Sequence, residues 1–156
     1  VPDELDYYPA LDRTMTVMEL ASQQKKNEAK QAYQEGLVSK DAYQALADQQ
    51  KDLYDTDKLG TRDKYALFLY GNNGFSRITG AGTGRVLVIK DSYANCFVPF
   101  LAQSYAQVDV VDLRSLKSTG LDELIAENNY DDVLVLYNFQ SFSSDTNLVL
   151  LNMYNN

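Results

Sequence analysis

Hydrophobic and polar residues follow a regular alternating pattern in the second half of the chain. Short continuous runs of apolar, mostly β-branched residues predict strands at 86–89, 108–113 and 133–137. Between and after them, helical spacing predicts helices at 97–106, 121–128 and 146–154. Nearly continuous apolar strands that alternate with helices are typical of a parallel sheet covered on both faces. We therefore expect a three-layer α/β fold with a mostly parallel sheet.

The first half of the chain has a different pattern. Residues 1–13 are acidic and contain two prolines, which predicts an extended lead-in. Apolar residues at helical spacing over 14–35, ended by Gly36, predict one helix. Ser39 is an N-cap candidate for a second helix over 40–54. We expect residues 1–60 to form this lead-in with a helical hairpin, and residues 61–156 to form the α/β domain.

Glycine and asparagine separate these two regions. The apolar and aromatic run at 64–70 (KYALFLY) predicts a strand that ends in a turn at 71–74 (GNNG), and 75–79 predicts a short partner strand. The segment GAGTG at 80–84 is glycine-rich, as phosphate-binding loops are. However, it precedes a strand and lacks the Lys-Ser/Thr pair of a P-loop, so we interpret it as a turn.

Charge and cysteine content exclude several classes of function. The chain has 14 basic and 22 acidic residues, a net charge of -8, which disfavours nucleic acid and anionic membranes as partners. No run approaches the ~18 apolar residues of a transmembrane segment. The single cysteine, Cys96, excludes an intramolecular disulfide and a cysteine-based metal cluster. We expect neither a metal nor a cofactor.

The sequence contains no histidine. The chain by itself therefore lacks the imidazole of a Ser-His-Asp triad. It begins at Val1 and not at a methionine, and we expect it to be a fragment of a longer protein.

The strand order predicts where a site lies. If the second strand lies outside the first and the third lies on its other side, a crevice opens between the first and third strands. The first strand ends in Lys90, Asp91, Ser92, Tyr93, Ala94 and Asn95, and the third ends in Tyr137 and Asn138. Ser92 then lies close to a helix N-terminus, where backbone N–H groups stabilise an oxyanion.

A simpler interpretation of the same residues remains open. Asp91 and Ser92 are both preferred helix caps, and Asn138 is a common turn residue. Asp112, at the end of the second strand, is expected to be a capping or solvent-exposed carboxylate away from the crevice.

Four segments in order carry a family resemblance: KYALFLYGNN, VLVIKDSYANCFVPFLAQSY, VDVVDLR and DDVLVLYNF. Together they resemble the C-terminal part of the DHHW family of bacterial proteins, which belong to the SGNH-hydrolase-like group and are distantly similar to alginate O-acetylation proteins. The resemblance covers about residues 63–142 and implies a flavodoxin-like or SGNH-like sheet.

The resemblance also implies roles for residues. Ser92 matches the nucleophile position with Asp91 before it, Asn138 is the inferred oxyanion-hole residue, and Gly71 and Asn72 line the same site. Further binding candidates around this site are Asn73, Lys90, Tyr93, Asn95 and Tyr137.

One departure from the family is large, because the Asp-His-His-Trp motif that would supply the catalytic histidine is absent. Either an upstream domain supplies it, which we prefer, or the chain is an inactive relative. The implied function is a serine esterase or O-acyltransferase that acts on acyl esters of carbohydrate, extracellular or at the cell envelope of a bacterium.

Two alternatives stay open. The crevice and its tyrosines also suit a non-catalytic surface domain that binds glycan or a protein partner. A flavodoxin-like nucleotide or flavin binder fits the topology, but no phosphate-binding loop follows the first strand.

Overall fold

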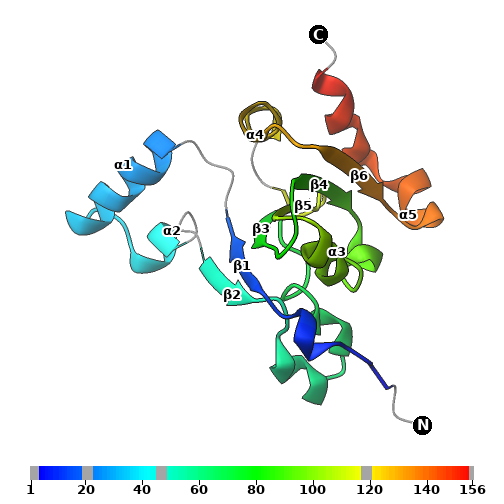
Figure 1. The fold of residues 1–156 in the computed structure, drawn as a ribbon. Coiled ribbons are helices and arrows are strands. Elements are labelled where there is room, and N and C mark those ends of the chain that lie inside the picture. The colour runs from blue at the N-terminus through cyan, green and yellow to red at the C-terminus, as the bar shows by residue number, and fades with distance from the viewer. Residues whose placement is uncertain (1–3, 19–22, 45–48, 117–120, 155–156) are drawn as a thin grey trace.

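A six-stranded mixed sheet organises the described part of the chain (Figure 1). The structure is a computed structural model, and it describes residues 4–18, 23–44, 49–116 and 121–154. The strands are β1 (Thr14–Val17), β2 (Gln49–Asp52), β3 (Phe75–Thr79), β4 (Arg85–Lys90), β5 (Gln107–Val111) and β6 (Asp132–Leu136). Their order across the sheet is β2-β1-β3-β5-β4-β6.

The predicted α/β fold is confirmed in the half of the sheet that contains β4. This strand pairs in parallel with β5 on one side and with β6 on the other. The strand order assumed for the crevice is therefore the observed one. The remaining pairs, β1 with β2, β1 with β3, and β3 with β5, are antiparallel, so the sheet is mixed.

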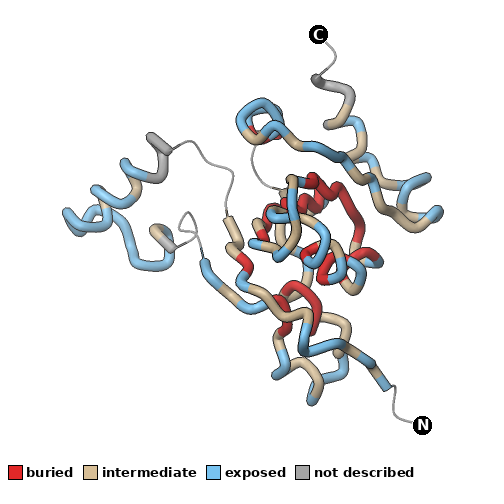
Figure 2. Tube along the Cα trace, viewed as in Figure 1, coloured by how far each residue is buried: buried red, intermediate tan, exposed pale blue. Residues whose placement is uncertain are grey.

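Helices cover both faces of this parallel part. Because side chains alternate along a strand, Val86 and Val88 face one side and pack in a cluster with Val98 and Ala102 of α3 (Val98–Ser104). Leu87 and Ile89 face the other side and pack with Leu121 and Leu124 of α4 (Leu121–Asn128). Figure 2 shows many buried residues in this central region and further ones in the segment below it.

The predicted helix over 14–35 is wrong at its beginning. Residues 14–17 form β1, and α1 spans Gln23–Gln34; residues 19–22 lie outside the described residues. Met15 is fully buried and pairs with Ile78 of β3, so burial of this side chain in the sheet overrides the local helical pattern. Gly36, with φ of 74°, follows α1 as expected.

The predicted helix over 40–54 is wrong at its end. Ser39 caps α2 (Lys40–Gln44) by accepting a hydrogen bond from the Ala42 amide (3.2 Å), but residues 49–52 form β2; residues 45–48 lie outside the described residues. The Asp12 carboxylate accepts a hydrogen bond from the Leu53 amide (2.8 Å) and holds this segment in place. Strands β1 and β2 come from residues 1–60 but belong to the same sheet as the later strands. A domain boundary at residue 60 stays a prediction.

The aromatic run at 64–70 is not a strand. It contains a 3₁₀ turn at Lys64–Leu67, preceded by another at Thr56–Gly60, and Phe68 forms an isolated bridge with Tyr54. The apolar character of the run reflects burial of Leu67, Phe68 and Leu69 in the core. The predicted short strand at 75–79 is confirmed as β3.

The glycine-rich connector is a turn that packs against α3. A Cβ on Gly80 or Gly82 would lie 2.0 Å from the backbone oxygen of Tyr105 or Ser104, respectively. These glycines therefore permit a close backbone approach and do not form a phosphate site.

The C-terminal segment contains a helix that the sequence pattern missed. It is α5 (Phe139–Ser144), and the predicted final helix is a 3₁₀ segment at Thr146–Tyr154. Two shorter 3₁₀ turns lie at Pro9–Leu11 and Ser92–Ala94. Among the helices of the described residues, none is both long and apolar enough to cross a lipid bilayer.

Candidate functional site

Asp91 joins the carboxyl ends of two neighbouring strands. It follows β4 and is fully buried, and one carboxylate oxygen accepts a hydrogen bond from the Tyr93 amide (3.0 Å). The other oxygen accepts one from the Asn138 amide, also at 3.0 Å, just after β6. The turn that carries Ser92 is thus tied directly to the end of β6. The predicted cap role of Asp91 is confirmed, although it caps the Ser92–Ala94 turn and not α3.

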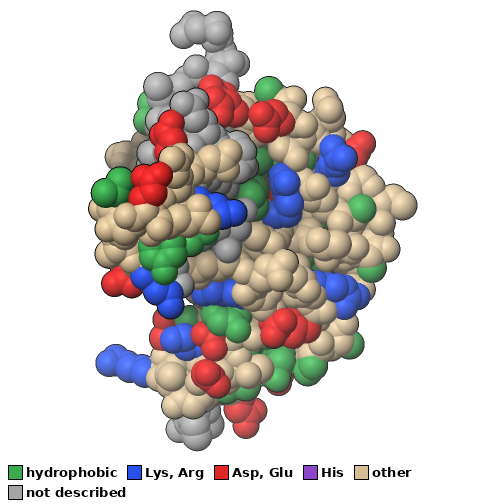
Figure 3. All heavy atoms as spheres, turned by 90° about the vertical axis from the view of Figure 1, so that its left-hand side faces the viewer, with side chains coloured by type: hydrophobic (Ala, Val, Ile, Leu, Met, Phe, Trp, Pro, Cys, Tyr) green, Lys and Arg blue, Asp and Glu red, His purple; other side chains and the backbone are tan. Residues whose placement is uncertain are grey.

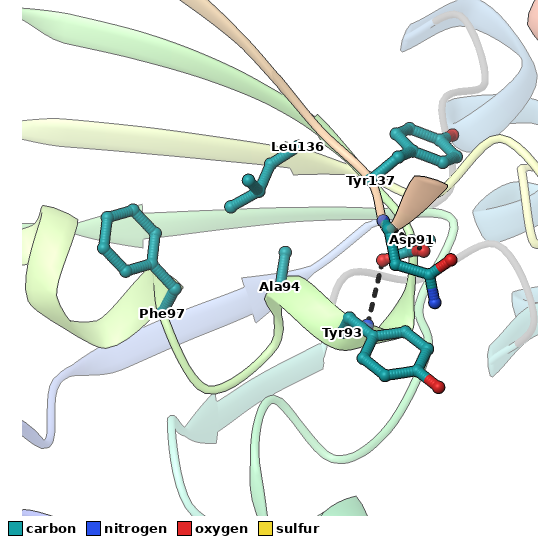
Figure 4. A pocket seen from close by; sticks show the side chains of 7 residues that line it. Asp91, Tyr93, Ala94, Phe97, Leu136 and Tyr137 are labelled. Carbon is teal, nitrogen blue, oxygen red and sulfur yellow. Dashed lines mark hydrogen bonds between the residues drawn. The ribbon is translucent and has the colours of Figure 1, made fainter. Parts of the chain in front are cut away.

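An open pocket of about 390 Å³ lies beside this junction (Figure 4). Its lining residues are mainly apolar or aromatic: Asp91, Tyr93, Ala94, Phe97, Leu136, Tyr137 and Asn138. Ser92 is half-buried and is not one of the lining residues, although its neighbours on both sides are. Among the described residues, its hydroxyl has no hydrogen-bond partner, so no base is in contact with it.

Within the described part of the chain, one polar atom of the Asn138 side chain is hydrogen-bonded, and the other is not. Its Oδ1 accepts a hydrogen bond from the Ser141 amide (2.8 Å) and caps α5. Its Nδ2 has no partner among the described residues. The capping role is therefore observed, and the donor that an oxyanion-hole role requires remains available.

Lys90 lies in the interior and not in the pocket. In the register of β4 with β5, Val88 pairs with Val110, which places Lys90 opposite Asp112 two residues further on. Lys90 Nζ lies 3.2 Å from Asp112 Oδ2, and Arg114 donates Nε and Nη2 hydrogen bonds to the same carboxylate at 3.0 and 2.7 Å. The expectation that Asp112 is solvent-exposed is wrong, because it is fully buried within this cluster. Its expected capping role is observed, since Oδ1 accepts a hydrogen bond from the Arg114 amide (3.1 Å).

The ionisation of this cluster follows from its contacts. Burial lowers the pKa of Lys90, although the Asp112 charge opposes this effect. For Asp112, burial acts to raise the pKa, but the Arg114 hydrogen bonds and the Lys90 charge outweigh it and leave the pKa below its ordinary value. These charges stabilise each other and hold the end of β4 against β5.

The 71–73 turn supports the site from below. Asn72 Oδ1 accepts hydrogen bonds from Asn95 Nδ2 (3.1 Å) and Lys90 Nζ (3.4 Å), and the Gly71 oxygen accepts one from Asn95 Nδ2 (3.4 Å). Asn73 donates to the Leu69 oxygen at 2.6 Å and so closes its own turn. These predicted binding residues have structural partners here, and their contact with a ligand stays a prediction.

That turn has an unusual backbone. Leu69 and Tyr70, with φ of 57° and 54°, precede Gly71 with φ of 86°. Consecutive left-handed residues are strained in a chain of L-residues, and such strain concentrates near functional sites. The turn contributes Gly71 and Asn72 to the network beneath Asn95, so its strain is held next to the Ser92 segment.

Tyr137 both lines the pocket and packs against the core. Its ring points away from Leu136 and Phe97 in Figure 4, and it packs in the cluster on the α4 face. Its hydroxyl is buried and has no hydrogen-bond partner in the part of the chain that the structure describes. Burial, together with the negative charge of Asp145, raises the pKa of Tyr137 to about 12.

Two of the lining residues, Phe97 and Leu136, were not predicted, and Ala94 was expected at the crevice but not as a binding residue. The sequence signal for them is weak, because each also belongs to an ordinary helix or strand pattern. Another missed residue is Tyr65, whose hydroxyl donates to the Tyr93 oxygen (2.9 Å) and accepts from the Cys96 amide (3.4 Å). It ties the Ser92 turn to the 3₁₀ turn at Lys64–Leu67.

The charged surface agrees with the composition. On the face shown in Figure 3, basic side chains are interspersed with acidic ones and form no continuous stripe among the described residues. Within the same residues, no cluster of three or more acidic or cysteine side chains is arranged to hold a metal ion.

Comparison with known proteins gives information on the fold. No protein-family model matches the chain, and no curated protein matches it. A crystal structure of a DHHW family protein from Eubacterium siraeum matches with a TM-score of 0.61 and 18% identity, over 90% of this chain and 40% of that one.

Two structures of PatB1 from Bacillus cereus also match. The one that holds a sulfonyl adduct has a TM-score of 0.58 and 23% identity over 85% of this chain and 38% of that one; the other has a TM-score of 0.56 and the same identity. This chain spans at most 40% of the length of these solved proteins. The predicted resemblance to the DHHW family is thus confirmed at the level of the fold, which this chain shares with these bacterial proteins.

Proposed function

We propose that these 156 residues are the nucleophile-bearing part of an SGNH-like serine esterase or O-acyltransferase. The observation that carries the proposal is the pair of Asp91 hydrogen bonds to the Tyr93 and Asn138 amides. They tie the turn that carries Ser92 to Asn138, which follows the neighbouring strand β6. Such a position, at the carboxyl edge of the parallel part of the sheet where the strand order reverses, is where ligands bind in this class of fold.

In the proposed mechanism, the Ser92 oxygen attacks the ester carbonyl while a base takes the hydroxyl proton. The oxyanion accepts hydrogen bonds from backbone N–H groups of the turn and from Asn138 Nδ2. The ester C–O bond then breaks, and the leaving alcohol takes the proton from the base. Water or a sugar hydroxyl releases the acyl group from Ser92, which distinguishes an esterase from a transferase.

Asp91 has a positioning role in this proposal. Both of its oxygens accept backbone hydrogen bonds and it is fully buried, so it is poorly suited to exchange protons with a substrate. Instead it fixes the distance between the Ser92 turn and Asn138.

The base must come from elsewhere, since the chain has no histidine. We propose that a longer protein contains this chain and that its remaining part supplies the histidine. The greater length of the matched structures supports this proposal. The sulfonyl adduct in one PatB1 structure supports the chemistry, because sulfonyl electrophiles are captured by activated nucleophiles.

We propose a carbohydrate ester, extracellular or at a bacterial cell envelope, as the substrate. The bacterial origin of the matched proteins and their shared fold support the setting. The apolar pocket beside Asp91 suits an acyl group, and Tyr93 and Phe97, which are 67% and 45% exposed at its rim, offer flat surfaces to a sugar ring.

Hydrolysis of 4-nitrophenyl acetate tests this proposal. The 156-residue chain should not exceed the buffer rate, whereas the longer protein should hydrolyse the ester. Ser92→Ala in the longer protein should reduce the rate at least about a thousandfold, because the nucleophile is lost. Ser143→Ala, a matched change at an exposed serine outside the pocket, should leave the rate unchanged. Equal rates for the longer protein and its Ser92→Ala variant would contradict the proposal.

A second candidate is a non-catalytic domain that binds glycan or a protein partner. Exposed aromatic side chains favour it: Tyr8 contacts Phe100, which is near Phe97, with ring centroids 5.6 and 6.5 Å apart. Binding on a glycan array by the 156-residue chain, with no ester hydrolysis by the longer protein, would support this candidate.

A further inference from the structure

A second, polar pocket lies near the first. It has a volume of about 310 Å³ and is lined by Arg114, Ser141, Ser144, Asp145, Thr146 and Asn147. Arg114 follows β5, and the other residues come from α5 and the segment after it, beyond β6. Because the parallel strands β5 and β6 end at the same edge of the sheet, this pocket opens at the edge where ligands bind in α/β folds.

Helix α5 connects the two pockets. Asn138, Ser141 and Ser144 follow each other at intervals of three residues, which places them along one side of this short helix. Asn138 lines the first pocket, and the two serines line the second. A ligand in the second pocket therefore contacts the same helix, α5, whose N-cap Asn138 is tied to the Ser92 turn.

The second pocket contains polar groups that have no hydrogen-bond partner among the described residues. Asp145 Oδ1 accepts hydrogen bonds from the amide and side chain of Asn147 at 2.9 and 2.8 Å, but its Oδ2 is buried and has no partner within the described residues. Among the described residues, the Ser141 hydroxyl and Arg114 Nη1 also have no partner. Asp145 lines the pocket, so its carboxylate is the acidic group that a ligand there would meet.

The charges of the pocket select the class of ligand. Asp145 disfavours an anion, Arg114 disfavours a cation, and the net charge of -8 opposes anions generally. A neutral molecule with several hydroxyl groups can donate to Asp145 and accept from Arg114 and Ser141. We propose that this pocket binds a neutral sugar ring, with Asp145 accepting a hydrogen bond from a sugar hydroxyl. Its role as the site for the carbohydrate part of the substrate rests on the proposed function, but the binding itself does not.

An NMR titration of the 156-residue chain with chitotriose, a neutral saccharide, tests the proposal. The amide signals of Ser141, Ser144 and Asn147 should shift and saturate, and glucosamine and inorganic phosphate should shift them less. Asp145→Ala should weaken binding about tenfold, the loss of one hydrogen bond to a charged group. Ser141→Ala should weaken it severalfold and removes a hydroxyl without a partner, so the fold is retained.

Ser143→Ala is the matched control, because the Ser143 hydroxyl donates to the Gln140 oxygen (2.9 Å) outside the pocket. The affinity of this variant for chitotriose should equal that of the unchanged chain. Absence of saturable shifts would overturn the proposal. Equal affinity of the unchanged chain, Asp145→Ala and Ser141→Ala would overturn it too, as would tighter binding of glucosamine or phosphate. Sugar binding without Ser92 reactivity would remove only the catalytic proposal, and Ser92 reactivity without sugar binding would remove only this site.

Discussion

At the carboxyl end of β4, the surroundings on the β5 side differ from those on the β6 side. Towards β5, Lys90, Asp112 and Arg114 form a buried cluster in which the carboxylate accepts hydrogen bonds from both cations. Towards β6, Asp91 binds only backbone amides, and an apolar pocket and the open Nδ2 of Asn138 lie beside it.

The contrast separates the residues that hold the strands from those that are free to meet a ligand. Lys90 and Asp91 are adjacent in sequence and are both almost completely buried. Lys90 nevertheless helps to hold two strands together, whereas Asp91 positions the residues beside the pocket. Ionisable type and position alone do not distinguish these roles. The partners of each group do.

Breaking the charged cluster should have the largest effect. Asp112→Ala leaves the Lys90 charge buried, with Asn72 as its remaining side-chain partner among the described residues, and should lower the free energy of unfolding by about 3–5 kcal/mol in urea denaturation. Asp63→Ala, a control at an exposed aspartate whose side chain makes no cap bond, should change it by less than about 0.5 kcal/mol. The double variant Lys90→Met with Asp112→Leu should recover most of the loss. A loss of under about 1 kcal/mol for Asp112→Ala would show that the cluster does not hold β4 to β5.

Removing the Asp91 carboxylate should have a smaller effect on stability. Asp91→Ala leaves two amides without their acceptor at the rim of a pocket that water can enter, and should cost on the order of 2–3 kcal/mol. Asp91→Asn keeps one acceptor oxygen and should cost about half as much. In the longer protein, both variants should also reduce ester hydrolysis. Unchanged stability of Asp91→Ala would contradict the link between the Ser92 turn and β6.

The cluster should also respond to pH in a defined direction. The folded pKa of Asp112 is lowered, so its ionised form contributes stability that is fully present above its unfolded pKa of about 3.9 and is lost as the pH falls through the lower folded value. The difference in free energy of unfolding between the unchanged chain and Asp112→Asn should therefore narrow below about pH 4. Urea denaturation at a series of pH values measures it, and a constant difference would contradict the assignment.

Tyr137 should give the smallest effect, with the opposite sign. Tyr137→Phe removes a buried hydroxyl that has no partner among the residues the structure describes, and should raise the free energy of unfolding by about 1 kcal/mol or less. Tyr130→Phe is the matched control, because the Tyr130 hydroxyl donates to the buried Asp109 carboxylate, and it should lower stability by about 1–2 kcal/mol. Equal losses for the two variants would mean that the Tyr137 hydroxyl has a partner in solution.

The sequence predicted the parallel half of the fold well. The continuous apolar strands around β4 and the helix at 121–128 depend on local patterns that tertiary contacts reinforce. Strands β1 and β2 were missed because their pairing with distant residues decides their structure: Met15 lies in the core opposite Ile78, within a segment whose spacing also fits a helix.

The candidate site could be predicted only in part. The position of Ser92, Asp91 and Asn138 follows from strand order, and the structure brings the Ser92 turn and Asn138 together. The partners of Lys90 and Asp112 follow from the register of β4 with β5, which a single sequence does not give. The pocket wall formed by Phe97 and Leu136 likewise depends on packing between α3 and β6.

The central claim is that Ser92 is a nucleophile that becomes reactive only with a base from the rest of a longer protein. Mass spectrometry after treatment with phenylmethylsulfonyl fluoride tests it most directly. The longer protein should gain one sulfonyl group on Ser92, and neither its Ser92→Ala variant nor the 156-residue chain should gain any. Labelling of another residue in the longer protein, or equal labelling of the Ser92→Ala variant, would contradict the claim.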